Sequence, residues 1–193
     1  MLILGSRIAN TAIMSLQTGT RIGQAVRPII DPANLKIFAY EIDGPLLDEH
    51  PSFLLTTDVR EMSPVGMIVD SSQELVGLFD IIKLKELNDI RFALVGMSVV
   101  DDMHHKLGKV EDYTMETGDF VIQQLSVKRG IIRGITDTGL LIHRSQIVEI
   151  NDQAIIVKSA TKEKRVTSRP VILDYVNPFR EGQTAQPEHI NRN

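Results

Sequence analysis

The sequence Gly108-Lys109-Val110-Glu111-Asp112 opens a predicted strand, and a weaker copy, Gly23-Gln24-Ala25-Val26-Arg27, stands earlier in the chain. Each copy follows a turn-rich polar run and leads into a second strand-like segment about a dozen residues later. Because the whole pattern occurs twice, the chain reads as one small β unit used two times.

The spacing between the two copies supports a true internal repeat. Gly23 corresponds to Gly108, and Ile37 corresponds to Ile122, at a constant offset of 85 residues. Later in the copies the offset becomes 88, because residues 67–69 correspond to residues 155–157. Three additional residues in a loop of the second copy explain the change. About six short strands in each copy, separated by turns, predict small antiparallel barrels, which would also remove exposed strand edges.

Composition limits the classes of function. Hydrophobic residues make up 42% of the 193 residues but aromatic residues only 5%, so the predicted core is aliphatic. There is no cysteine, which excludes disulfides, thiol catalysis and cysteine-bound zinc. A net charge of −4 argues against a broad basic surface for nucleic acid or membrane. No signal peptide or transmembrane run is recognised, so we expect a cytoplasmic protein without membrane insertion.

Between the copies, residues 75–90 carry apolar side chains at helical spacing. This segment is predicted to be a helical or irregular connector that docks the two copies together. Within the first copy, alternation places Phe38, Tyr40 and Ile42 on one face of a strand. Residues 171–173 read as an additional strand, and the polar stretch 177–193 reads as a disordered tail.

These residues carry a resemblance to the PRC-barrel family. The segment 107–112, followed by residues 144–150 and 154–157, resembles the family most closely. Residues 15–19 with Ile22-Gly23 resemble the opening of a further copy, although Gln24 and Ala25 stand where a lysine–valine pair is usual. The two copies together cover residues 12–90 and 92–165.

The resemblance implies a fold and a class of role. The family fold is a β-barrel of about six strands, found in the cytoplasmic part of the photosynthetic reaction centre H subunit and in a ribosome maturation factor. Neither specific role transfers, because the chain lacks the membrane helix of the one and the N-terminal domain of the other. The implied architecture is mainly all-β, with two small antiparallel PRC-type barrels in tandem. The domains expected are residues 1–90 with the connector, residues 91–176 and the tail 177–193.

Two polar clusters are candidates for a site. Residues 101–105, Asp-Asp-Met-His-His, offer ligands for a divalent metal, but neighbouring side chains on an extended segment point opposite ways, which favours a loop tip. Ser145, His143 and Asp137 offer a nucleophile, a base and an orienting acid, but no nucleophile elbow surrounds the serine. We therefore predict no catalytic residue, no metal and no cofactor.

The predicted function is a non-enzymatic scaffold that binds a protein partner through barrel surfaces, with no small-molecule substrate. The alternative is an RNA-processing or ribosome-assembly factor that binds RNA or a ribosomal protein. Basic residues of the second copy are the candidates for partner binding: Lys106, Lys109, Lys128, Arg129 and Arg133. The loops 43–52 and 101–106 and the tail are where the copies differ and where function is expected.

Overall fold

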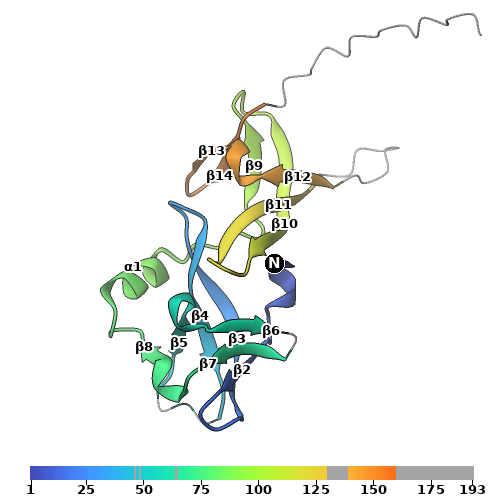
Figure 1. Cartoon of the computed structure of the whole chain (residues 1–193). Coiled ribbons are helices and arrows are strands. Elements are labelled where there is room, and N and C mark those ends of the chain that lie inside the picture. The colour runs from blue at the N-terminus through green and yellow to red at the C-terminus, as the bar shows by residue number, and fades with distance from the viewer. Residues whose placement is uncertain (46, 48, 64, 130–138, 160–193) are drawn as a thin grey trace, which may run out of the picture. The chain divides into compact units, whose positions relative to one another are not determined.

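The computed structural model describes residues 1–45, 47, 49–63, 65–129 and 139–159, which belong to one compact unit, Met1–Ser159 (Figure 1). The unit is mainly β, as the aliphatic composition predicts. Its strands are β1 (Leu2–Leu4), β2 (Ala12–Ser15), β3 (Arg21–Asp31), β4 (Lys36–Asp43), β5 (Ser52–Leu55), β6 (Glu61–Ser63), β7 (Gly66–Val69), β8 (Leu75–Gly77), β9 (Ser98–Asp101), β10 (Lys106–Glu116), β11 (Val121–Lys128), β12 (Leu140–His143), β13 (Ile147–Ile150) and β14 (Ala154–Val157). The helical elements described are α1 (Ile82–Ile90) and the 3₁₀ turns η1 (Gly5–Arg7), η2 (Thr56–Asp58), η3 (Ser72–Glu74) and η4 (Arg144–Gln146). None of them is long and apolar enough to cross a membrane.

The internal repeat is confirmed by the strand register. Strands β2–β7, here called the first half, correspond one by one to β9–β14, the second half. Gln24 lies opposite Asp43 in the β3–β4 pair, and Lys109 lies opposite Lys128 in the β10–β11 pair, 85 residues later in each case. The irregularities match as well, since β3 and β10 each carry two register shifts at positions that differ by 85.

The two halves meet at a junction with local two-fold character. The Ile37 N–H donates to the Phe120 carbonyl, and the Ile122 N–H donates to the Leu35 carbonyl, both at 2.9 Å. Leu35 and Phe120 both adopt the left-handed backbone region, with φ of 54° and 56°, and both are buried. A non-glycine residue adopts this region at a cost, so its occurrence at equivalent positions shows that the junction itself repeats.

One hydrophobic cluster spans both halves. It holds Ile13, Ile37 and Leu54 of the first half together with Val99 and Ile155 of the second, all fully buried. A shared core suits two small units, because each alone buries only a limited apolar area.

The strand connections depart from the prediction in one respect. The strands form one continuous network in which β11 pairs with β4, and the pairings between described residues do not close into rings. Most pairs are antiparallel, but β2–β7 and β9–β14 are parallel, so a purely antiparallel arrangement is wrong. The cause is the hairpin β6–β7, which brings β7 back beside β2 in the same direction. The predicted strand at 171–173 and the tail 177–193 lie outside the described residues.

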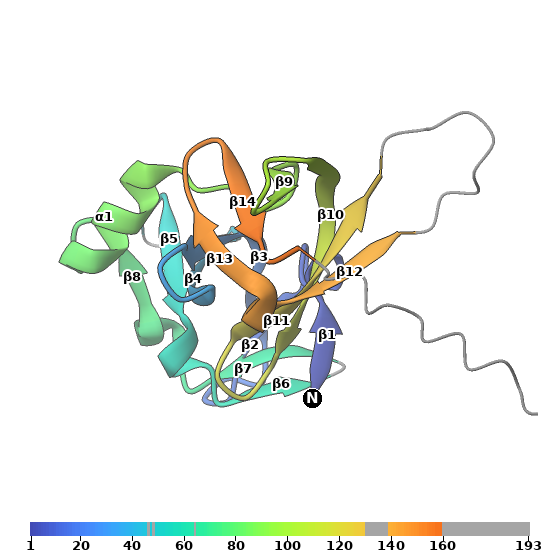
Figure 2. The same ribbon diagram turned by 90° about the horizontal axis from the view of Figure 1, so that it is seen from above.

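Helix α1 packs on the outer face of the first half. Its buried Leu84 and Leu87 form a second cluster with Ile29, Ala39 and Phe53, from β3, β4 and β5. Figures 1 and 2 show α1 beside these strands and away from β10–β12. The expectation that this helical segment docks the two halves together is therefore wrong, since its apolar residues contact the first half.

The two glycines that open β3 and β10 serve the fold. A Cβ on Gly108 would collide with the Lys128 carbonyl oxygen, and Gly108 has φ 154°, which side-chain-bearing residues rarely adopt. A Cβ on Gly23 would lie 3.0 Å from the carbonyl oxygen of Asp43, the residue of the first half that corresponds to Lys128. Close approach of the neighbouring strand, rather than chemistry, explains the repeated glycine.

Candidate functional site

The predicted basic residues form a small exposed group on the second half. Lys109 and Lys128 lie directly opposite each other on neighbouring strands, and both are exposed. Lys128 Nζ lies 3.6 Å from the Glu111 carboxylate, so the group contains an acid as well. Lys106 and Arg129 are exposed at the start of β10 and after the end of β11, and Arg133 lies outside the described residues.

The Asp101–His105 cluster forms the turn between β9 and β10. The Asp101 carboxylate accepts hydrogen bonds from the backbone N–H groups of Met103 and His105, and its Oδ2 lies 3.0 Å from His105 Nδ1. Partial burial raises the pKa of Asp101, but these bonds outweigh it and lower the pKa below its ordinary value. Asp102 instead binds the N–H and hydroxyl of Ser159. Among the described residues, no three histidine or carboxylate side chains gather as metal ligands.

His143 and Ser145 do meet, for a local structural reason. The Ser145 N–H donates to His143 Nδ1 at 3.2 Å, and its hydroxyl lies 2.8 Å from the same atom. The His143 N–H donates to the Gln146 side chain at 2.8 Å, which completes a capping box at the start of η4. The hydrogen bonds between the serine and the histidine thus cap a turn. Asp137 lies outside the described residues.

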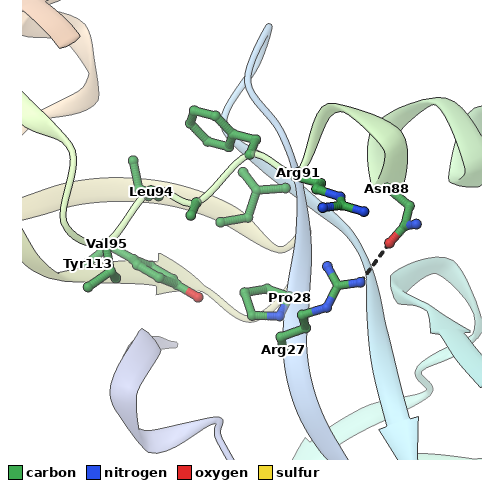
Figure 3. Close-up of a pocket in the computed structure, with 10 residues that line it drawn as sticks. Arg27, Pro28, Asn88, Arg91, Leu94, Val95 and Tyr113 are labelled. Atoms are coloured by element: carbon green, nitrogen blue, oxygen red, sulfur yellow. Dashed lines mark hydrogen bonds between the residues drawn. The ribbon is translucent and has the colours of Figure 1, made fainter. Parts of the chain in front are cut away.

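A further candidate site is a cavity of about 540 Å³ that the sequence did not predict (Figure 3). One wall is β3, through Arg27, Pro28 and Ile30, and another is the segment 91–95 that follows α1. Asn88 from the last turn of α1 and Tyr113 from β10 complete the lining. The cavity therefore joins residues of the first half, the connector and the second half.

Two arginines supply positive charge at one end of the cavity. The Arg27 Nε pairs with the Glu41 carboxylate at 2.5 Å, and its terminal N–H donates to the Asn88 side chain at 2.6 Å. Arg91 caps α1 with φ 52°, and its N–H donates to the Asn88 carbonyl at 3.1 Å. Arg91 has no carboxylate within ion-pair distance in the part of the chain that is described. Figure 3 shows both guanidinium groups beside Asn88.

The other end of the cavity is apolar and contains one hydroxyl. Leu94 is buried, and Val95 is 53% exposed at the rim. Burial of Tyr113, together with the nearby Asp112 charge, raises the pKa of its phenol well above the ordinary value. The phenol therefore stays protonated at neutral pH and acts as a hydrogen-bond donor. Together with the two arginines, the Tyr113 hydroxyl gives the cavity hydrogen-bond donors. None of the described residues that line the cavity is an aspartate or a glutamate.

One difference between the two copies could have drawn attention to Arg27. Arg27 occupies the position that Asp112 occupies in the second half, a reversal of charge at an offset of 85 within an otherwise matched strand. The segment that carries Arg91 corresponds to the N-terminal segment 86 residues earlier, because the Gly96 N–H donates to the Val110 carbonyl as the Asn10 N–H donates to the Ala25 carbonyl. Arg91 therefore stands where Gly5 stands in that segment. Comparison of the chain with models of protein families and with curated proteins found no match.

Proposed function

We propose that the chain is a non-enzymatic binding module, built from two PRC-type barrel units in tandem, that recognises a protein partner. The single observation that carries this proposal is the cavity beside β3, which combines apolar walls with hydrogen-bond donors. Such a combination is typical of recognition sites, where apolar contacts supply affinity and a few polar groups fix orientation. The PRC-barrel resemblance, whose members act as adaptors, supports the same role.

The polar clusters favour binding over catalysis. Asp101 is engaged by its own turn, and His143 and Ser145 cap η4. A catalytic group needs a free face toward a substrate and a matched pKa. These side chains are instead committed to local structure.

The test is affinity capture of the full chain, tagged, from the cells that produce it, with nuclease-treated and untreated samples analysed by mass spectrometry and by nucleic-acid staining. A protein that co-elutes with the chain in stoichiometric amount after nuclease treatment, and that rebinds when both proteins are purified, supports the proposal. Recovery of RNA alone, or of no partner even after reversible crosslinking, contradicts it.

The second candidate function is RNA binding through the exposed basic group, and the Lys109–Lys128 pair favours it. Like charges directly opposite on neighbouring strands repel, and an anionic partner would relieve that cost. In a titration of labelled single-stranded RNA, this function predicts binding that weakens steeply with salt and is lost when Lys128, Arg129 and Arg133 are reversed to glutamate. Absence of binding at low salt removes this candidate.

A further inference from the structure

The repeat places two equivalent segments beside the long strands, and a large cavity lies beside only one of them. The segment 91–95 and the N-terminal segment 5–9 correspond, and Leu94 and Ile8 at matching positions are both buried. The cavity beside 91–95 has a volume of about 540 Å³, whereas the one beside 5–9 has about 40 Å³. Because the segments that follow make equivalent backbone hydrogen bonds, the difference comes from side chains.

The side chains that differ are an aromatic ring and a glycine. Tyr113 of β10 and Pro28 of β3 are equivalent residues, 85 positions apart in matched strand pairs. The Tyr113 ring packs so closely on Gly5 that a Cβ on this glycine would collide with it. In the first half the smaller Pro28 replaces the ring, and Arg91 replaces the glycine. The first half therefore lacks an aromatic ring where the second half has one, and a guanidinium group stands beside that place.

The Tyr113 hydroxyl is a hydrogen-bond donor that faces the cavity. Tyr113 is 4% exposed, and its hydroxyl makes no hydrogen bond to any residue that the structure describes. Every fully buried side-chain nitrogen or oxygen in this part of the chain has a partner, so this hydroxyl must reach open space. Figure 3 shows it pointing toward Pro28. A largely buried donor without a protein partner favours a ligand that brings an acceptor.

Arg91 supplies the positive charge at the opening. Its side chain is exposed, and no carboxylate of the described residues lies within ion-pair distance of it. Arg27 differs in this respect, because it is paired with Glu41 and bonded to Asn88. A carboxylate matches a guanidinium group through two parallel hydrogen bonds, so Arg91 favours a ligand that carries one.

We propose that the cavity binds an aromatic acid, a ligand with a ring and a carboxylate on a short tether. The ring takes the space left by Pro28 and packs on Phe92 and Leu94. The carboxylate pairs with Arg91, and an oxygen on the far side of the ring accepts a hydrogen bond from the Tyr113 hydroxyl. The cavity is within the range of about 300–1,000 Å³ that is typical of sites for small ligands.

Two sources offer this chemistry: a free aromatic acid, and a tyrosine at the C-terminus of a partner protein. The inference goes beyond the proposed function, because it assigns a ligand chemistry to the cavity for either source.

The probe is N-acetyltyrosine, which carries the ring, the carboxylate and the far oxygen, titrated into the full chain by isothermal titration calorimetry. Each of three controls lacks one group: N-acetyltyrosinamide the carboxylate, N-acetylphenylalanine the ring hydroxyl, and N-acetylalanine the ring. We expect saturable binding of the probe. Binding is expected to be at least about tenfold weaker without the carboxylate or the ring, and about two- to tenfold weaker without the ring hydroxyl.

The protein variants test each contact through a change of preference, which a general loss of stability would not produce. Tyr113→Phe removes only the hydroxyl, so N-acetyltyrosine and N-acetylphenylalanine are then expected to bind equally. Tyr40→Phe is the matched control, because its hydroxyl donates to Met115 outside the cavity, and the preference is expected to persist. Melting temperatures establish that the variants fold.

Arg91→Asn removes the charge and keeps a residue that tolerates the left-handed backbone. This variant is expected to lose the preference for N-acetyltyrosine over its amide. Arg129→Asn, which removes an exposed charge outside the cavity, is expected to keep that preference.

A glycine–serine peptide that ends in tyrosine distinguishes the two sources. If the peptide binds at least as tightly as N-acetyltyrosine, the opening admits the end of a chain, and a partner C-terminus is the source. If it binds more than about tenfold more weakly, the source is a free acid. Either result supports the ligand chemistry.

Three results overturn the proposal: no saturable binding of N-acetyltyrosine, equal binding of the acid and its amide, or a preference for the ring hydroxyl that survives in Tyr113→Phe. Equal binding of N-acetylalanine also overturns it, because the site would then be one for any small anion. If no aromatic acid binds and a protein partner is still captured, this inference fails while the proposed function stands. If N-acetyltyrosine binds and no partner is captured, the proposed function fails while this inference stands.

Discussion

The outer faces of the two halves differ more than their backbones. In the first half the outward residues are Ile29, Ala39 and Phe53, which are buried beneath α1. Their equivalents in the second half are Thr114, Gln124 and Leu141, and Leu141 is 58% exposed. An apolar face must be covered and a polar face need not be, so the two polar replacements, Thr114 and Gln124, explain why only the first half carries a helix on this face.

The strand edges differ in the complementary way. β10 is covered by β1, and the N-terminal ammonium lies 3.9 Å from Glu116. At the equivalent position of β3, Asp31 pairs with Lys83 of α1 at 3.0 Å. The same backbone thus has its edge covered by β1 in one half and its outer face covered by α1 in the other.

The largest expected effect comes from the helix-covered face. Phe53→Ala removes a fully buried ring from the cluster beneath α1 and is expected to lower the free energy of unfolding by about 3–5 kcal/mol. The equivalent Leu141→Ala, at an exposed position, is expected to change it by less than about 0.5 kcal/mol. Urea denaturation followed by circular dichroism measures both. Equal losses at the two positions would contradict the difference between the faces.

A smaller effect is expected at the repeated glycines. Gly108→Ala forces an unfavourable φ and a contact with the Lys128 carbonyl, so a loss of about 1–3 kcal/mol is expected. Gly23→Ala meets a side-chain methyl of Ile42 and the Asp43 carbonyl without a positive φ, so a smaller loss is expected. Urea denaturation of the two single variants measures which one loses more free energy of unfolding. A greater loss at Gly23 would show that crowding, and not backbone conformation, decides the cost.

A third effect concerns the segment that covers β10. Ser6→Ala removes the hydroxyl that donates to Asp112 at 2.6 Å, and a loss of about 1 kcal/mol is expected for an exposed bond to a charged acceptor. Hydrogen exchange of residues 114–116 is expected to accelerate, because β1 is held less firmly. Thr11→Ala, which removes a 3.3 Å bond to the Arg7 carbonyl in the same region, is the matched control with the smaller effect. Unchanged exchange in Ser6→Ala would mean that β1 holds without this anchor.

The sequence predicted the repeat well because glycines, turns and aliphatic strands recur at fixed spacing. The change of offset from 85 to 88 is confirmed, since β4 and β11 keep the first offset and β7 and β14 have the second. The interpretation of the opening glycine as a fold signature is supported by the close approach at Gly108.

The expected face of β4 was wrong because of a bulge. The register shift between Ile30 and Ile29 leaves Phe38 as the extra residue, so it packs with the outer cluster while Tyr40 and Ile42 face the shared core. A strict two-residue alternation cannot anticipate such a shift. The cavity could not be predicted from a local sequence pattern either, because it depends on the path of the segment that follows α1.

The smallest expected effect lies in the turn between β9 and β10, where the Asp101 carboxylate accepts two backbone hydrogen bonds. Its carboxylate has a pKa below the ordinary value of 3.8, so the folded state binds the proton more weakly than the unfolded state. The stabilisation is therefore present above the unfolded pKa and is lost as the pH falls through the lowered folded pKa. Asp101→Asn is expected to lower the melting temperature slightly at pH 7 and not at all below the folded pKa. Thermal melts of both proteins between pH 7 and pH 2.5 (about one unit below the ordinary value) measure this, and a difference that persists undiminished at the lowest pH would show that the turn depends on side-chain shape rather than charge.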